Sequence, residues 1–321
     1  MTDIAQLILN LLIFPGGLFA LVLGLLLAGI DRKIAARLQR RIGPPIYQPF
    51  VDLVKLTRKE MVIPATAHPG AFRLAPLLGL AGMMVAVTLI PIAGVYQGFT
   101  QAGDLLVLLY LLALPAIALM IGGSASSSPF GAVGFSREMV MMMSYELPLL
   151  VVLVTAALKV GLATGGIATF SLREIVQFQL ENGPLFFDYT MLPAFLAFLA
   201  FIPGNMGVVP FDIPEAEPEI VEGPILEYSG AGLALFKLMT SLKMVVVLGL
   251  AVALFFPTPL GESVLLNLFW FFLKCLILMV ISITVVRTST GRLRMDQAFK
   301  YYLRYPTALA LVSLVLTLLL G

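Results

Sequence analysis

Charged residues are scarce in this sequence. Asp, Glu, Lys and Arg make up only 12% of the 321 residues, whereas 60% are hydrophobic. A soluble domain of this length needs far more charge to cover its surface, but a surface that faces lipid can be apolar all round. The composition therefore argues against a soluble protein and predicts an all-α integral membrane protein.

Cysteine and histidine are almost absent as well. The single cysteine, Cys275, cannot form a disulfide within the chain and cannot ligate an iron–sulfur cluster alone. The single histidine, His68, excludes a multi-histidine metal or haem site and leaves no convincing Ser/His/Asp set. Phosphate-binding and dinucleotide-binding glycine motifs are also missing. We therefore expect no catalytic residue, metal or cofactor in this chain, and any electron-carrying cofactor to belong to a partner subunit.

Apolar runs of about 20 residues, enough to cross ~30 Å of hydrocarbon, recur along the chain. They predict a single transmembrane domain, residues 1–321, with about eight helices. We expect these helices near residues 4–30, 72–95, 104–122, 146–163, 190–210, 232–256, 264–287 and 305–320, the last being the shortest. The first run is too long for a signal peptide and is expected to be retained.

Basic residues are concentrated in alternate loops. Fifteen of the twenty Lys and Arg residues lie in the first, third and seventh loops, and nine of these are in segment 31–73. The loops of the opposite side hold only Lys159 and Arg173. Because cytoplasmic loops carry an excess of Lys and Arg, we predict that loops of about 31–71, 123–145, 211–231 and 288–304 face the cytoplasm. Both termini of this multi-pass cell-membrane protein would then lie on the outer side.

Two of the loops are expected to contain short helices. Residues 47–61 mix apolar and charged side chains in a pattern typical of an amphipathic helix at the membrane interface. That helix either only fixes the topology or contacts a partner. The outer segment 164–189 is expected to hold a small surface helix around residues 172–180.

The most unusual feature is an acidic segment, residues 211–228, which contains no Lys or Arg. Its carboxylates are Asp212, Glu215, Glu217, Glu219, Glu222 and Glu227. Carboxylates so close together repel, so some must be protonated, paired with cations from elsewhere in the chain, or solvated. Such a group can titrate together and pass protons on, or it can dock a basic partner surface. Pro214 and Pro218 prevent a regular helix through the first half.

Several ionisable residues are expected at membrane depth. Lys243, Lys274 and Glu146 fall within apolar runs, where charged groups usually face a polar interior. Lys237 lies close enough to a helix end to extend its ammonium group to the interface. Glu138 and Glu146 could continue a polar path from the acidic segment, or they could form structural ion pairs.

The order and spacing of these motifs resemble a known family, the H subunit of respiratory complex I. The resemblance covers nearly the whole chain. It is carried by Asp31-Arg32-Lys33, the Arg-Ile-Gly-Pro-Pro run at 41–45, residues 48–56, Ser144-Tyr145-Glu146 and the Pro-Phe-Asp-Ile-Pro-Glu-Ala-Glu run at 210–217. A short first loop, with Gly43 only five residues before Gln48, and the segments 128–138 and 222–232 are more similar to the membrane anchor of group 4 energy-converting nickel–iron hydrogenases and the related archaeal sulfane-sulfur-reducing complex.

The resemblance implies a non-catalytic anchor and coupling subunit of a respiratory redox complex. Peripheral subunits carrying iron–sulfur clusters and a nickel–iron or derived centre would dock on the cytoplasmic face, and antiporter-like membrane subunits would move H⁺ or Na⁺. The carboxylates of the acidic segment would form the coupling loop, and the polar path would contain Glu138, Glu146, Lys237 and Lys243. The alternatives are a quinone-reducing complex I-type subunit, the anchor of a sulfur-reducing complex, a stand-alone transporter and a passive anchor. No nucleic-acid partner is expected.

Overall fold

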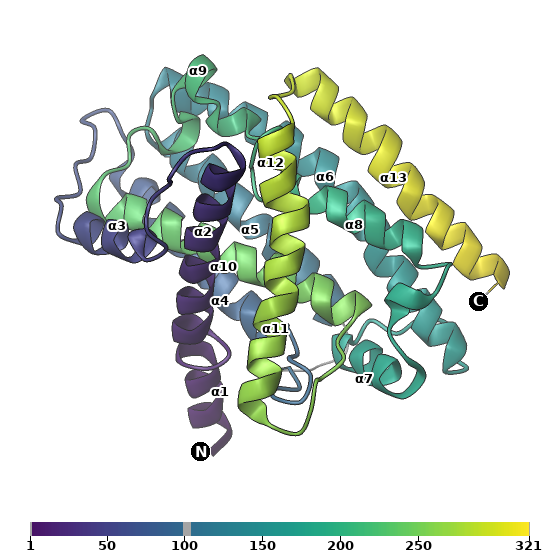
Figure 1. Cartoon of the computed structure of the whole chain (residues 1–321). Helices are drawn as coiled ribbons and strands as arrows, with labels where there is room; N and C mark the ends of the chain where they lie inside the picture. The colour runs from purple at the N-terminus through teal and green to yellow at the C-terminus, as the bar shows by residue number, and fades with distance from the viewer. Residues whose placement is uncertain (1, 99–103, 321) are drawn as a thin grey trace.

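The computed structural model describes residues 2–98 and 104–320, without the side chains of residues 2–4, 6, 7 and 217. All regular secondary-structure elements in these ranges are helices (Figure 1). The longer helices are α1 (Thr2–Leu12), α2 (Gly17–Leu38), α3 (Gln48–Thr57), α4 (Pro69–Leu89), α5 (Asp104–Ala125), α6 (Pro129–Ala163), α7 (Leu172–Asn182), α8 (Leu192–Asn205), α10 (Gly230–Phe255), α11 (Val264–Met279) and α13 (Met295–Leu320). The short ones are η1 (Leu185–Phe187), η2 (Ile213–Glu215), α9 (Glu217–Ile220), η3 (Gly223–Ile225), the π-helix η4 (Val280–Val285) and α12 (Val286–Ser289).

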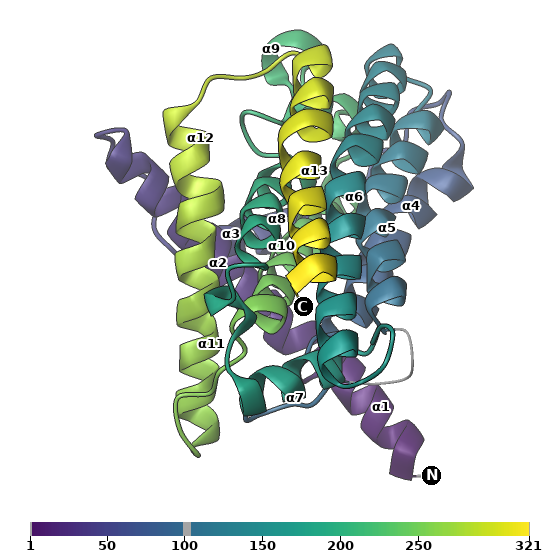
Figure 2. The ribbon, with the colours of Figure 1, turned by 90° about the vertical axis from the view of Figure 1, so that its right-hand side faces the viewer.

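Seven spans of the described chain are long and apolar enough to cross a membrane, and α8 is a shorter apolar helix of 14 residues. Helices suit this environment because they pair their backbone polar groups internally, where no water is present to do so. The prediction of an all-α membrane protein with about eight such helices is confirmed. Turned by 90°, the helices form a bundle with α1 and the N-terminus at one end and α9 at the other (Figure 2).

Helix α10 lies at the core of this bundle. Every residue from Ser241 to Phe255 is buried, and the helix contacts α2, α3, α4 and α11. Gly24 of α2 permits the close approach, because a Cβ atom there would lie 2.3 Å from the carbonyl oxygen of Ser241. Lys243 is therefore enclosed by neighbouring helices, whereas Lys237, nearly two turns earlier, is exposed as expected.

The chain differs from the prediction at its first and second apolar runs. The run 4–30 is not one helix: α1 ends at Leu12 and α2 begins at Gly17. Pro15 lies between them, and it has no N–H to continue the helical hydrogen bonds. The helix predicted at 72–95 ends at Leu89, because Pro91 disfavours helical backbone in the residue before it.

Two predicted loops are also shorter than expected. Helix α6 begins at Pro129, so most of the predicted loop 123–145 is helical, and α13 begins at Met295 inside the predicted loop 288–304. Charged residues lower the hydropathy of both segments without disfavouring a helix: Arg137 and Glu138 in the first, Asp296, Lys300 and Arg304 in the second. With 35 residues, α6 is about 52 Å long and extends well beyond ~30 Å of hydrocarbon. The shortest membrane helix is α8 rather than the last one.

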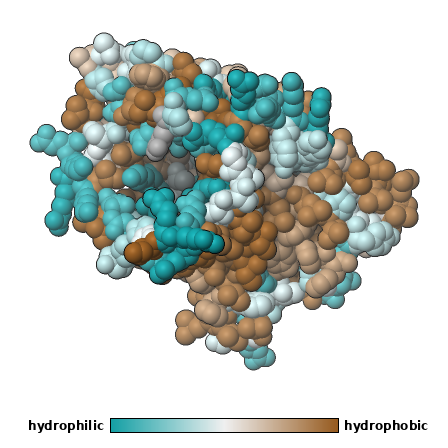
Figure 3. All heavy atoms as spheres, turned by 45° about the horizontal axis from the view of Figure 1, so that its top comes forward, coloured by the Kyte–Doolittle hydropathy of each residue, from teal (hydrophilic) through white to brown (hydrophobic). Residues whose placement is uncertain are grey.

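The two short helices expected in the loops are present. The predicted helix within 47–61 is α3, and the predicted helix around 172–180 is α7. Hydrophilic residues gather at the end of the molecule that carries α9 and the α12–α13 connection, whereas apolar residues cover much of the sides in this view (Figure 3). We call this the hydrophilic end. Its assignment to the cytoplasm stays a prediction.

Lys274 has a structural role at the opposite end of α10. Its ammonium group donates hydrogen bonds to the carbonyl oxygens of Phe256, at 2.7 Å, and Thr258, at 2.6 Å. The ring of Trp270 lies 5.5 Å away. Lysine near the last carbonyls of a helix satisfies groups that have no partner within the helix. The buried charge of Lys274 is therefore used to end α10.

Candidate functional site

The acidic segment folds as a series of single turns at the hydrophilic end. The elements η2, α9 and η3 are three or four residues long, as the prolines of the segment predict. Phe211 and Ile213 are buried and attach the segment to the bundle, and the ring of Phe211 lies 4.8 Å from that of Tyr302 in α13. The side chain of Glu217 lies outside the described residues.

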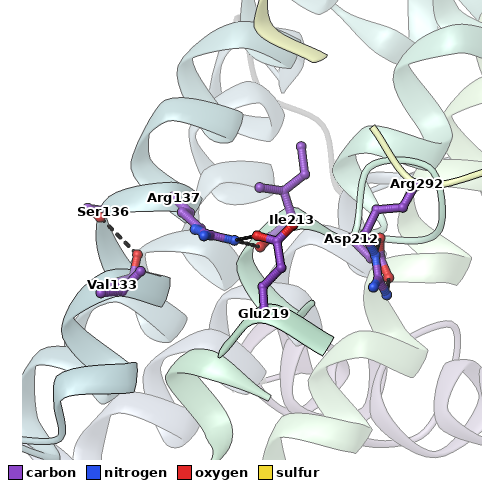
Figure 4. A network of polar contacts seen from close by, with 7 residues as sticks. All are labelled: Val133, Ser136, Arg137, Asp212, Ile213, Glu219 and Arg292. Atoms are coloured by element: carbon purple, nitrogen blue, oxygen red, sulfur yellow. Dashed lines mark hydrogen bonds and ion pairs between the residues drawn. The ribbon is translucent and has the colours of Figure 1, made fainter. Parts of the chain in front are cut away.

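Two arginines from other parts of the chain hold the acidic segment at both sides of η2 (Figure 4). Arg292, in the α12–α13 connection, forms a two-point ion pair with Asp212, with Nε 2.9 Å from Oδ1. Arg137 of α6 pairs with Glu219 and also donates to the carbonyl oxygen of Ile213, at 3.4 Å. In the sequence both arginines indicate only topology, because nothing in the linear order relates them to the acidic segment.

These ion pairs are partly exposed, so each contributes only about 0–1 kcal/mol to folding. Replacing Arg292 by glutamine is expected to leave global unfolding nearly unchanged. It should raise the amide hydrogen exchange of residues 211–216 roughly five-fold, because a loss of about 1 kcal/mol makes local opening more frequent. Arg294→Gln, an exposed arginine in the same connection, is the matched control. Equal exchange in both variants would contradict a holding role for Arg292.

Glu215, between the two arginine contacts, is directed to a different environment. It lines a small cavity of about 50 Å³ together with Glu138 of α6 and Lys243 of α10. Glu138 and Lys243 are only 7% and 5% exposed. Burying charges is costly unless they are paired or neutralised, so two carboxyls and one ammonium group form a mutually dependent cluster. We call these three residues the buried cluster.

The pKa of Glu215 is raised to about 7. Burial of the carboxyl is the largest cause, the charge of Glu138 raises the pKa further, and Lys243 opposes the rise. Asp212 and Glu222 add smaller contributions that also raise it. Glu215 is therefore close to half protonated at neutral pH, where a small change in its surroundings alters its charge.

Glu215 also lines a second, larger cavity. This cavity, of about 240 Å³, lies among α2, α3 and α10, has a mostly apolar lining and includes Lys237 and Asp52. Glu215 and Thr240 line both cavities. In the smaller one, the buried Oδ1 atom of Asn205 accepts no hydrogen bond from the described residues. A cavity of 50 Å³ lined partly by polar side chains has room for water, and Glu215 is placed between this cavity and the larger, mostly apolar one.

The remaining predicted site residues are not in these cavities. Glu222 is exposed and Glu227 is half-buried at the hydrophilic end. Glu146 lies eight residues after Glu138, about 12 Å farther along α6, and its buried Oε1 atom has no hydrogen-bond partner within the described chain. Within the described residues, no three His, Cys, Asp or Glu side chains are placed to hold a metal ion.

The chain matches a known protein family. Residues 10–318 match the NADH dehydrogenase family. The chain belongs to this family. Among curated members, it is 40% identical to hydrogenase-4 component C of Escherichia coli over 242 residues, which cover 74% of this chain and 72% of that protein. It is 36% identical to formate hydrogenlyase subunit 4 of the same organism, over 84% of this chain and 87% of that one.

The NADH dehydrogenase family also includes subunits of quinone-linked enzymes. The chain is 32% identical to the H subunit of NADH-quinone oxidoreductase from Dehalococcoides mccartyi, over 93% of this chain and 83% of that protein. A solved structure of the membrane-bound sulfane sulfur reductase, an archaeal respiratory membrane complex, contains a chain with a TM-score of 0.82 and 26% identity. That match covers 93% of this chain and 96% of the other. The resemblance seen in the sequence is confirmed in both branches.

Proposed function

We propose that this chain is the membrane anchor and coupling subunit of a hydrogenase-type respiratory complex. Peripheral redox subunits would dock on the hydrophilic end, and the chain would transmit their redox change to ion movement in neighbouring membrane subunits. The family membership and the two hydrogenase-related relatives support the class of complex. The iron–sulfur clusters and the nickel–iron or derived centre would belong to the docked subunits.

The observation that carries the coupling role is that Glu215, within the acidic segment, shares a cavity with Glu138 of α6 and Lys243 of α10. Asp212 and Glu219 are paired with arginines, and both Asp212 and Glu215 of this segment line the cavity that holds Glu138 and Lys243. A docked subunit that shifts this segment would change the environment of Glu215. Because Glu215, which is half-buried, shares its cavity with the buried Glu138 and Lys243, a proton gained or lost by Glu215 would change the charge balance of all three groups.

The first experiment is isolation of this chain from a mild-detergent extract, with mass spectrometry and metal analysis of the proteins that come with it. Nickel together with hydrogen evolution is expected. Iron–sulfur subunits without nickel would favour a sulfur-reducing or quinone-reducing complex. A chain that purifies alone and moves ions in liposomes would contradict the proposal.

A second candidate function, quinone reduction by an associated subunit, is favoured by the larger cavity. Its apolar lining and its contact with Glu215 would suit an apolar ring that accepts protons. Extracting the purified complex with organic solvent should release a quinone in roughly equal amount to the complex if this alternative holds. Absence of bound quinone, together with hydrogen evolution, would leave the hydrogenase-type function.

A further inference from the structure

We propose that a groove between α2 and α12 binds the phosphate headgroup of an anionic phospholipid. The groove has a volume of about 550 Å³ and lies at the hydrophilic ends of the two helices. Three arginines line it, Arg32, Arg41 and Arg287, together with Gln39. The acidic segment and the buried cluster contribute no residue to this groove, so the proposal is independent of the coupling function.

A buried carboxylate, that of Asp31, holds the side chain of Arg287 in the groove. Asp31 of α2 is 4% exposed and accepts hydrogen bonds from Oγ1 of Thr284, at 2.7 Å, and from Nη2 of Arg287, at 2.9 Å. Thr284 lies in the π-helix η4, an irregularity that often marks functional sites. A guanidinium group carries five N–H donors. The pair with Asp31 therefore fixes Arg287 and leaves donors for an anion in the groove.

Arg41 supplies the unbalanced positive charge. It is exposed, and no carboxylate of the described chain lies within ion-pair distance of it. Its position is fixed by the turn that ends α2, where its N–H donates to the carbonyl oxygen of Ala36 at 2.7 Å. The turn requires glycine at Gly43, which has a φ of +70° and whose added Cβ would lie 2.5 Å from that of Ala36. Arg32, by contrast, already contacts Asp52 at 3.5 Å.

An exposed apolar stripe lies on the same continuous helical segment as Arg287. Ile277, Ile281 and Val285 are spaced four residues apart on α11 and η4, and they are 50%, 52% and 45% exposed. Val285 is two residues before Arg287. Residues two apart lie on different faces of a helix, so the acyl chains of a bound lipid would first contact the apolar residues that line the groove itself, Ile42 and Val209, and only then this stripe. Basic pockets between membrane helices are typical sites for anionic headgroups, and a free phosphate would use only the groove.

The test uses the intact complex in detergent, exchanged with phosphatidylglycerol or phosphatidylcholine and analysed by native mass spectrometry. The complex should retain phosphatidylglycerol preferentially. Arg41→Gln should reduce that retention roughly five-fold, the effect of losing one arginine near a membrane surface. Arg58→Gln, an exposed arginine of the same basic loop outside the groove, should leave it unchanged.

Four results would overturn the proposal. Equal retention of both lipids, or equal retention in the two variants, would show that the groove does not select an anionic headgroup. Displacement of the lipid by millimolar inorganic phosphate would identify a site for the free anion. Loss of a peripheral subunit from Arg41→Gln, with phosphatidylglycerol retention intact, would identify the groove as a docking surface for an acidic protein segment.

Discussion

Replacing Lys243 by methionine is expected to lower the stability of the membrane domain by about 1–3 kcal/mol, the usual cost of leaving a buried polar group without compensation. Lys243 is 5% exposed and shares a small cavity with Glu138 and Glu215. Its loss would leave two buried carboxyls without a cation. The measurement is thermal unfolding of the complex in detergent, followed by ion translocation per electron in proteoliposomes, which we expect to be lost.

The control for this prediction is Lys237→Met on the same helix. Because Lys237 is exposed, its replacement should cost less than about 1 kcal/mol. The double variant with Glu138→Gln and Lys243→Met should regain part of the lost stability, since it removes one of the two uncompensated carboxyls. If Lys243→Met and Lys237→Met lower the unfolding temperature equally, the buried cluster does not depend on its cation.

Glu215→Gln is expected to abolish the pH dependence of coupling near neutrality. The pKa of Glu215 is raised to about 7, above the value of about 4.3 typical of an exposed glutamate. A carboxyl of this kind contributes stability in its protonated form, fully below about pH 4. That contribution is lost as the pH rises through about 7. The wild-type complex should therefore show a carboxyl infrared band and an ion-to-electron ratio that both change near pH 7.

In Glu215→Gln both changes should disappear, and translocation per electron should fall to a small fraction of the wild-type value while electron transfer continues. Glu222→Gln is the matched comparison, because Glu222 lies in the same acidic segment but is exposed and outside both cavities. If Glu215→Gln translocates ions normally and keeps the titrating band, the acidic segment is only a docking surface.

For the acidic segment, the sequence predicts the possible states of the carboxylates but not which residue adopts which state. Clustered carboxylates had to be protonated, paired with distant cations or solvated, and all three occur. Glu215 has a pKa near 7, Asp212 and Glu219 have arginine partners, and Glu222 is exposed. Which carboxylate is protonated, which is paired and which is solvated was not predictable, because it depends on where Arg137 and Arg292 lie in space.

The helix boundaries missed in the sequence have a similar cause. Residues 129–145 and 295–304 are helical although they were expected as loops, because charged residues such as Arg137 and Lys300 lower the hydropathy of a helix in the same way as a loop does. Hydropathy measures transfer into lipid rather than helix formation. The single helix expected at 4–30 was divided at Pro15, where the missing N–H was a signal that sequence analysis could have used.

Composition by itself determined that this protein is a helical membrane protein, since lipid tolerates an apolar surface, and that one cysteine and one histidine cannot build a metal cluster. Sequence order also located the acidic segment and the lysines at membrane depth. Only the tertiary structure decided that Lys243 shares a cavity with Glu138 and Glu215, whereas Lys274 ends α10. The physical reason is that the state of a buried charge depends on its neighbours in space, and these come from helices that are far apart in the chain.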